Sequence, residues 1–183
     1  GIGSEVIVKA LSNREIYNVC SPVVIGNVKV MKDAVKITES DVDIRPISQL
    51  EISEVRYVTI DVFEPEKPVI DELLPYGEIN RSAGEAAVKY IEAAVRFALD
   101  GVVNAIITAP INKAALHLAG YNYPGHTELL AKLTNTDVSV MMLAGKKLRV
   151  AYATTHVAIS DISKLLSIDK IFRVVQISGE TLI

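Results

Sequence analysis

The sequence is poor in cysteine and in aromatic residues, and it contains no tryptophan. Its single cysteine, Cys20, has no partner for an internal disulfide, so a disulfide-stapled fold is excluded. Cys20 precedes an apolar run, and we expect it to be a small buried hydrophobic residue. The stability of the fold must come from apolar packing, for which 50% of the 183 residues are hydrophobic.

A block of basic residues is also missing. The 19 lysines and arginines are scattered among 22 acidic residues, and the net charge is −3, so we expect no nucleic-acid partner. No apolar stretch is long enough to span a bilayer, and no signal peptide opens the chain, so we expect no membrane partner. These absences together predict a soluble cytoplasmic protein.

Both ends of the sequence are unusual. The chain opens with a glycine loop, Gly-Ile-Gly-Ser-Glu, and a helical pattern follows, whereas such a loop normally follows a strand. Residues 171–183 have a helical pattern up to the last residue. We therefore expect the sequence to be the N-terminal portion of a longer protein, with a piece before Gly1 and a larger piece after Ile183.

A helix followed by a buried strand is the clearest fold signal. Residues 82–100 repeat apolar side chains at helical spacing, with Asn80 or Ser82 as the N-cap and Gly101 at the C-terminal end. Residues 102–108 form a continuous apolar run, which is typical of a strand buried on both faces of a parallel sheet. We predict an α/β fold in which this strand is central. Further strands are predicted over residues 22–25, 42–47, 56–63, 138–143 and 148–154. Shorter helices are predicted over residues 5–11, 28–35, 112–118 and 127–133, up to Leu166, and from 169 onward. The predicted N-caps are Ser4 for the first of these helices, Asn27 for the second, Ser160 or Asp161 for the helix that ends at Leu166, and Asp169 for the last.

The first polar cluster, Thr-Ala-Pro-Ile-Asn-Lys, occupies residues 108–113. Asn112 can cap the helix that follows, and the free N–H groups of a helix start attract anions. Lys113 adds a positive charge at the same place. One interpretation is an anion contact, to a substrate carboxylate, a phosphate or a cofactor. The other is a well-capped turn with a solvated lysine, and the residues alone do not decide between them.

The second cluster, Gly-His-Thr-Glu, occupies residues 125–128. It places His126 in a loop at a helix start, with the Thr127 hydroxyl beside it. Both side chains can donate hydrogen bonds to a polar or anionic ligand. The alternative is a histidine whose role is structural.

The third cluster, Thr-Thr-His, ends at His156 and follows a predicted strand, so its imidazole can face a cleft. Neutral imidazole is the commonest metal ligand, but a catalytic zinc site has three protein ligands. His117, the only other histidine beside His126, lies in a predicted helix and is interpreted as structural. If His156 binds a metal, its partner ligands are outside this sequence.

The order and spacing of these clusters resemble the 4-hydroxythreonine-4-phosphate dehydrogenase family. The resemblance runs the whole length of the chain and is carried by residues 1–5, 108–113, 125–128, 141–143, 148–150 and 154–156. It implies an α/β fold like that of isocitrate and isopropylmalate dehydrogenases, present as an N-terminal portion. Residues 1–125 would belong to the first lobe and residues 126–183 would begin the second. It also implies a homodimer, NAD or NADP, and a divalent metal such as zinc, magnesium or cobalt.

By this resemblance, His126 and Thr127 match the substrate-binding pair, and His156 matches the first metal-ligand histidine. The two further metal histidines, and the lysine, asparagine and arginine that hold the substrate, would lie beyond Ile183. The implied reaction oxidises 4-hydroxythreonine 4-phosphate and releases carbon dioxide, which yields 3-amino-2-oxopropyl phosphate in vitamin B6 biosynthesis. The metal would act as a Lewis acid on the substrate hydroxyl, and the nicotinamide would take the hydride.

Three other functions stay open. Dehydrogenases of threonate or erythronate 4-phosphate have nearly the same motifs, and Ile111 and Asn112 do not distinguish them. Phosphate acetyltransferases share a related fold but transfer an acyl group without metal or nicotinamide. A non-catalytic fragment or subunit that only assembles is the third alternative. His156, as a metal-ligand histidine, favours a dehydrogenase.

Overall fold

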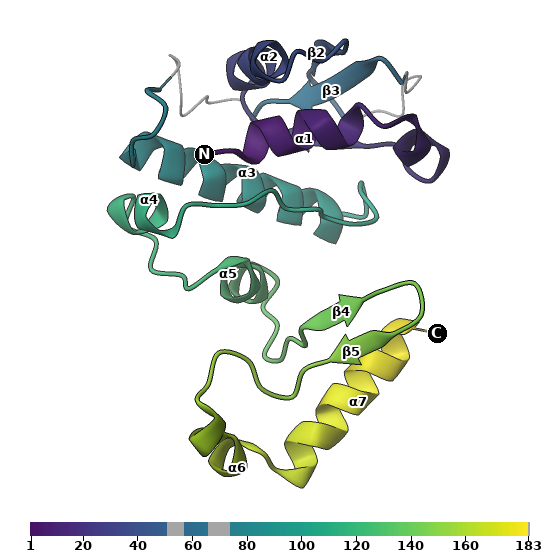
Figure 1. Cartoon of the computed structure of the whole chain (residues 1–183), viewed down its shortest axis with the longest axis vertical. Helices are drawn as coiled ribbons and strands as arrows, with labels where there is room; N and C mark the ends of the chain where they lie inside the picture. The colour runs from purple at the N-terminus through teal and green to yellow at the C-terminus, as the bar shows by residue number, and fades with distance from the viewer. Residues whose placement is uncertain (51–56, 66–73, 183) are drawn as a thin grey trace. The chain divides into compact units, whose positions relative to one another are not determined.

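The computed structural model describes residues 1–50, 57–65 and 74–182. They fall into two units, Gly1–Asn135 and Thr136–Ile183, drawn in Figure 1 and described separately below. The first unit is a mixed α/β structure with a parallel sheet, so the predicted α/β class is confirmed. The predicted division into lobes at residue 125 concerns a complete protein and stays a prediction. No helix within the described ranges has both the length and the apolar character that a membrane span needs.

The sheet of the first unit contains β1 (Val23–Ile25), β2 (Asp43–Ile47) and β3 (Thr59–Phe63). The strand order is β1-β3-β2, and both pairs are parallel. The strands predicted over residues 22–25 and 42–47 are confirmed. The strand predicted over residues 56–63 is found from Thr59 to Phe63. Arg56, the first residue of that prediction, lies outside the described residues. Strands this short depend on side-chain packing, which the β-branched residues of β1 and β3 provide.

Helices α1 (Gly3–Leu11) and α2 (Val28–Ile37) supply the core against the sheet. The buried side chains of this core are Val8, Val24, Met31, Ala34, Val42, Ile60 and Val62. The Asn27 side chain caps α2 by accepting a 2.9 Å hydrogen bond from the Val30 N–H, as the sequence predicted. Helix α1 has no side-chain cap and begins at Gly3, so the prediction of Ser4 as its cap is wrong.

A 3-10 helix, η1 (Arg14–Asn18), leads from α1 toward β1 and places Cys20 at the surface. The thiol donates a 3.5 Å hydrogen bond to the Ile16 carbonyl and does not enter the core. The prediction of a buried Cys20 is therefore wrong, because the apolar run begins only after the thiol, at Pro22.

Helix α3 (Arg81–Leu99) is the longest helix of the described chain. Asn80 caps it by accepting hydrogen bonds from two backbone N–H groups, and Gly101 follows its end with φ of +71°, as predicted. Near its C-terminal end, Phe97 contacts Phe63 of β3 edge to face, with ring centroids 5.2 Å apart. Phe63 and its neighbour Val62 point to opposite faces of the sheet, so α3 packs on the face opposite the α1–α2 core.

The prediction of a buried central strand over residues 102–108 is wrong for this structure. This segment has no strand conformation, and the side chains of Val102 and Ile107 are 51% and 93% exposed. A strand exists only where a neighbouring backbone completes its ladder of hydrogen bonds. In the described part of the chain β1, β2 and β3 pair only with one another, so the apolar run has no such neighbour.

Two short helices, α4 (Lys113–Leu118) and α5 (His126–Leu133), complete the first unit and pack against α3. Both occupy positions that the sequence predicted. A second core, made of Ile91, Val95 and Leu129, joins α3 to α5. This packing is why the first unit extends to Asn135 and includes α5.

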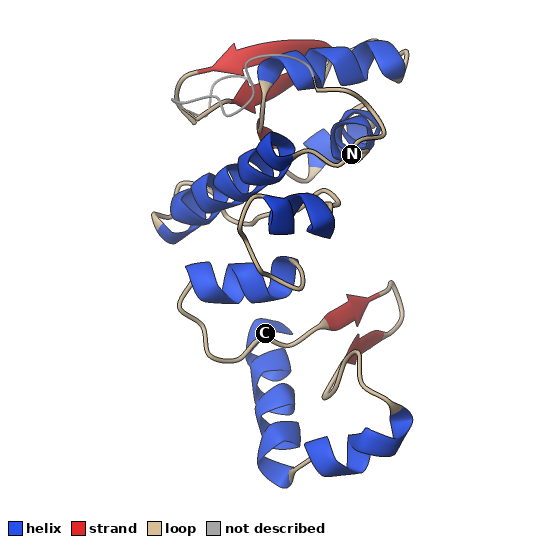
Figure 2. Cartoon of the chain, turned by 90° about the vertical axis from the view of Figure 1, so that its left-hand side faces the viewer, coloured by secondary structure: helices blue, strands red, loops and turns tan. Residues whose placement is uncertain are grey.

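The second unit contains an antiparallel pair of strands, β4 (Met142–Ala144) and β5 (Arg149–Ala151), as predicted but shorter. A 3-10 turn, η2 (Ile159–Asp161), leads into α6 (Ile162–Leu165), and α7 (Ile168–Leu182) follows; Figure 2 shows these helices in blue and the strands in red. The Ser167 hydroxyl accepts a hydrogen bond from the Lys170 N–H, so Ser167 caps α7 in place of the predicted Asp169.

Candidate functional site

His126 is the first residue of α5, and it is half-buried. Gly125 precedes it in an extended conformation and provides no side-chain cap, so the first turn of α5 keeps N–H groups free of a capping side chain. The Nε2 atom of His126 is shielded from solvent and has no hydrogen-bond partner among the described residues. Burial lowers the pKa of the imidazole below its usual value, so the ring is neutral near pH 7. Its hydrogen-bonding capacity is therefore unused within the described chain.

Thr127 stands next to His126 in the first turn of α5, and its side chain is exposed. Two residues later, Leu129 is 1% exposed and enters the second core. The helix is therefore anchored by one face while its first turn stays accessible. The Thr127 hydroxyl is available there for a ligand.

Lys113 is the first residue of α4, and Asn112 caps this helix as predicted, by accepting a 3.0 Å hydrogen bond from the Ala115 N–H. Lys113 is exposed, and within the described residues it forms no ion pair. With six residues, α4 has only a short dipole, so the ammonium group is the stronger attraction for an anion.

The segments that carry Lys113 and His126 are attached to the same core. Ile111, two residues before Lys113, and Tyr123, three residues before His126, both pack on the second core. The structure therefore places Lys113, His126 and Thr127 in the first unit on a shared apolar base. Ammonium, imidazole and hydroxyl groups can each hold an oxygen atom of an anionic ligand.

His156 lies in the second unit, in the loop after β5, and it is exposed. Its backbone is left-handed, with φ of +56°. Glu39 and Asn135 also have positive φ, but each follows the C-terminus of a helix, where this conformation is common. His156 does not follow the C-terminus of a helix. Non-glycine residues with a left-handed backbone are concentrated at functional sites.

The described residues do not by themselves form a metal site. They contain no group of three or more histidine, cysteine, aspartate or glutamate side chains that could hold an ion. His156 therefore supplies at most one ligand, and the described part of the chain does not fit a complete centre for a divalent metal.

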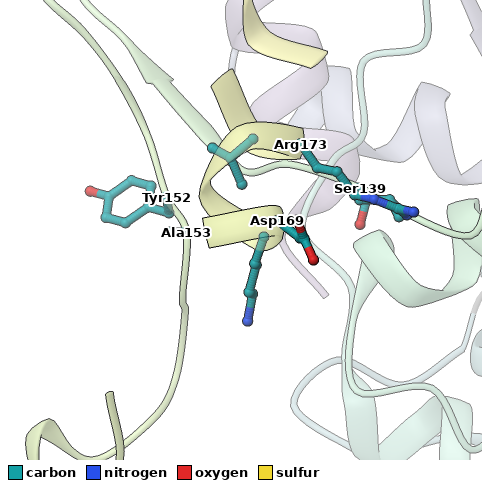
Figure 3. Close-up of a pocket in the computed structure, with 8 residues that line it drawn as sticks. Ser139, Tyr152, Ala153, Asp169 and Arg173 are labelled. Atoms are coloured by element: carbon teal, nitrogen blue, oxygen red, sulfur yellow. The ribbon is translucent and has the colours of Figure 1, made fainter. Parts of the chain in front are cut away.

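A cavity of about 390 Å³ lies in the second unit. Some of its lining residues come shortly before His156 in the sequence. Tyr152 and Ala153 line it, together with charged side chains from the start of α7. Figure 3 shows Arg173 and Asp169 next to Ser139, while the ring of Tyr152 points away from them. The sequence analysis missed these charged residues; their spacing, which puts Asp169 and Arg173 on one side of a helix, was the available signal.

A second group that the sequence analysis missed lies near the carboxyl ends of β1 and β3. The Glu64 carboxylate accepts a 2.6 Å hydrogen bond from the Asn27 side chain and a 3.2 Å bond from the Val28 N–H. The hydroxyl of Tyr90 is buried without a hydrogen-bond partner in the described chain, and burial, with a smaller effect of Glu64, raises the pKa of Tyr90 to about 12. Because Glu64 already occupies the start of α2, that helix offers no vacant anion site.

Comparison with known families gives a match over most of the chain. The family described as "Pyridoxal phosphate biosynthetic protein PdxA" matches residues 18–183. The D-threonate 4-phosphate dehydrogenase of Cupriavidus necator is 40% identical over 182 residues, which are 100% of this chain and 54% of the relative. The 4-hydroxythreonine-4-phosphate dehydrogenase of Trichlorobacter lovleyi is 37% identical over 180 residues, covering 98% of this chain and 53% of the relative.

Solved structures show the same similarity. The crystal structure of a 4-hydroxythreonine-4-phosphate dehydrogenase from Burkholderia phymatum superposes with a TM-score of 0.92 at 40% identity, over 100% of this chain and 55% of that chain. The chain thus spans about half the length of the curated relatives it matches. These matches agree with the resemblance drawn from the polar clusters.

Proposed function

Because this chain belongs to the PdxA family of pyridoxal phosphate biosynthetic proteins, we propose that it carries part of the active site of a dehydrogenase for a phosphorylated four-carbon hydroxy acid. The proposed substrate is 4-hydroxythreonine 4-phosphate. Its C3 hydroxyl loses a proton and C3 loses a hydride, which NAD or NADP accepts. The resulting 3-keto acid then loses its carboxylate as carbon dioxide, and protonation at C2 gives 3-amino-2-oxopropyl phosphate, a precursor of vitamin B6.

D-threonate 4-phosphate is the second candidate substrate, since a relative with that specificity in its name is 40% identical to this chain. The two substrates share the phosphate, the carboxylate and the C3 hydroxyl, and they differ at C2, where one carries an amino group and the other a hydroxyl. The roles assigned below concern only the shared groups.

In this proposal His126 and Thr127 hold oxygen atoms of the substrate, and Lys113 attracts its phosphate or carboxylate. The observation that carries it is the shielded Nε2 of His126, which has no partner in the described chain at the start of an uncapped helix. A buried polar atom without a partner costs free energy, and a ligand oxygen in hydrogen-bond reach of the ring would offset part of that cost. The neutral ring can hold a substrate hydroxyl or carboxylate without carrying a charge of its own.

We assign one ligand of a divalent metal ion, zinc, magnesium or cobalt, to His156; the other ligands would come from outside the described residues. A cation bound there would polarise a substrate oxygen. The nicotinamide enters the proposal through the reaction class of the relatives. The steps assigned to this chain are therefore binding and orientation of the substrate.

The proposed complete enzyme has the fold of isocitrate and isopropylmalate dehydrogenases and is a homodimer. Its first lobe would contain residues 1–125, and its second lobe would begin with residues 126–183. The parallel sheet of the first unit, with helices on both faces, is compatible with that fold.

The test is steady-state kinetics of the complete protein with each of the two substrates and with NAD and NADP. Replacement of His126 by alanine should lower kcat/KM by roughly tenfold or more, since a hydrogen bond to a charged ligand contributes about 1.5–3 kcal/mol. His117→Ala is the matched control, because His117 is exposed on α4 and forms no side-chain hydrogen bond in the described chain. Turnover of neither substrate, or transfer of an acetyl group between phosphate and coenzyme A instead, would refute the proposal.

A further inference from the structure

Gly84, in the first turns of α3, lies against the backbone of α4. A Cβ atom at this position would lie 2.1 Å from the carbonyl oxygen of Ala115, 2.4 Å from its carbonyl carbon and 2.9 Å from the Leu116 nitrogen. All three are backbone atoms, which cannot rotate away as the end of a side chain can. Helix α4 therefore keeps its place on α3 only while residue 84 lacks a side chain.

Gly3, at the start of α1, contacts the same segment further upstream. A Cβ atom on Gly3 would lie 3.3 Å from the Cβ of Ala109 and 3.4 Å from the carbonyl oxygen of Pro110. Gly3 and Gly84 thus contact the segment of residues 109–115 at its two ends. Lys113 lies between the two contacts.

The position of this segment depends on packing. A helix of six residues is too short to be stable by itself, so α4 is held by its buried side chains, Ala115 and Leu116. The segment before α4 has no strand partner in the described chain. A shift of α4 against α3 would therefore carry Lys113, its first residue, with it.

We propose that Gly84, together with Gly3, is a positioning residue that sets where the Lys113 ammonium meets the anionic group of the substrate. This inference rests on the role proposed above for Lys113. Gly84 touches no ligand, and its effect passes through the backbone of α4. A side chain at residue 84 moves α4 away from α3 and takes Lys113 out of line, so substrate binding weakens more than the chemical step.

The experiment uses the complete protein with four variants: Gly84→Ala, Lys113→Ala, the double variant and Met31→Ala. Gly84→Ala should raise the substrate KM by roughly tenfold and change kcat by less than about threefold. The double variant should have the KM of Lys113→Ala within about twofold, because both changes remove the same contact. Met31 is 3% exposed in the α1–α2 core, so Met31→Ala should lower Tm without changing KM.

Two outcomes overturn the inference and leave the proposed function intact. One is an unchanged KM in Gly84→Ala. The other is a KM in the double variant that rises by the product of the two single increases. An unchanged KM in Lys113→Ala refutes instead the role of Lys113, and the positioning inference falls with it. If Gly84→Ala does not fold, Gly3→Ala decides by the same criterion: its contacts are longer, so KM should rise by about threefold, again without a further increase over Lys113→Ala.

Discussion

At the scale of single residues, burial couples the protonation of His126 to the fold. Burial lowers its pKa below the usual value of 6.5, so the folded chain resists the proton that the unfolded chain accepts. Below about pH 6.5 the unfolded state therefore binds more protons than the folded state, and stability falls as pH falls from there through the folded pKa. Above that range the contribution of His126 is fully present.

This coupling predicts how the pH dependence of unfolding changes when His126 is replaced. Urea denaturation midpoints of the chain, measured on either side of the usual histidine pKa, should fall less on acidification in His126→Gln than in the original sequence. His117→Gln, at an exposed position, should follow the original sequence. If the urea midpoint falls equally on acidification in His126→Gln and in the original chain, the lowered pKa of His126 is contradicted.

Arg45 and Asp61 form an ion pair across the sheet, with a largely buried carboxylate. They are opposite each other in the β2–β3 register, and two hydrogen bonds of 2.6 and 2.7 Å join the guanidinium to the carboxylate. The side chain of Asp61 is 9% exposed and that of Arg45 is 37% exposed. A buried carboxylate that loses its cation is costly, because little water can replace the partner.

We expect Arg45→Met to lower the free energy of unfolding by about 2–3 kcal/mol, less than for a fully buried pair because Arg45 reaches solvent. Adding Asp61→Asn should restore part of that loss by removing the unpaired charge. Lys89→Met is the control: Lys89 pairs with Glu85 on the surface of α3, and such pairs contribute at most about 0.5 kcal/mol. Equal losses in Arg45→Met and Lys89→Met would show that burial of Asp61 is unimportant.

At the scale of elements, α5 carries the proposed substrate pair, and Leu129 is its one fully buried side chain, with Leu130 and Leu133 partly buried against the same core. Leu129 is 1% exposed and contacts Ile91 and Val95 of α3, whereas the first turn of α5 has no side-chain cap. With eight residues, α5 has little stability of its own. Its attachment to α3 therefore decides where His126 lies.

Leu129→Ala should lower the free energy of unfolding by about 3–5 kcal/mol, since it removes buried methyl groups and leaves a cavity between α3 and α5. Leu143→Ala, on β4, removes the same atoms from a side chain that is 54% exposed and should cost far less. Denaturant titration measures both. If Leu129→Ala lowers the free energy of unfolding by less than about 1 kcal/mol, α5 is held by other contacts.

At the scale of the whole molecule, the two units differ in their cores. Every buried hydrophobic residue of the described chain lies in the first unit, at or before Leu129. The described helices and strands of the second unit bury no side chain, and Phe172 and Val175 of α7 are 65% and 64% exposed. Since apolar burial is the main stabilising contribution, we expect the second unit to have little stability of its own in the 183-residue chain.

Hydrogen exchange of the 183-residue chain should show this difference. Amides of α7 should exchange at close to unprotected rates, while amides of α3 and β3 should be protected by the full stability of the first unit. Protection of α7 equal to that of α3 would contradict the prediction, and would mean that the apolar side chains of the second unit are covered in solution.

Metal binding gives a second prediction at this scale. The 183-residue chain should bind zinc weakly and should have no dehydrogenase activity, because its described residues contain no set of three ligands. The complete protein should bind metal and lose activity when the metal is chelated, and His156→Ala in that protein should abolish metal-dependent turnover. Calorimetric titration of both proteins with zinc tests this. Tight, stoichiometric binding by the 183-residue chain would show that its ligands have been misidentified.

The sequence by itself determined the local elements and the family. Asn27, Asn80 and Asn112 each cap the helix that the sequence predicted for them, because a cap is a hydrogen bond to a backbone group two or three residues away. The periodicity of residues 82–100 predicted α3 for a similar reason, since helical spacing is a property of neighbouring residues. The polar clusters carried the family resemblance through their order and spacing, and the family match confirms it.

Only the tertiary structure decided which backbones meet. Residues 102–108 have the composition of a buried strand, but a strand also needs a neighbour, and the described chain supplies none. Gly84 stands in an alanine-rich helix without any local reason, and its role becomes visible only with the Ala115 carbonyl beside it. The same holds for Arg45 and Asp61, which are 16 residues apart in sequence and adjacent in the sheet. Contacts between distant segments depend on the packing of the whole unit, which local spacing does not encode.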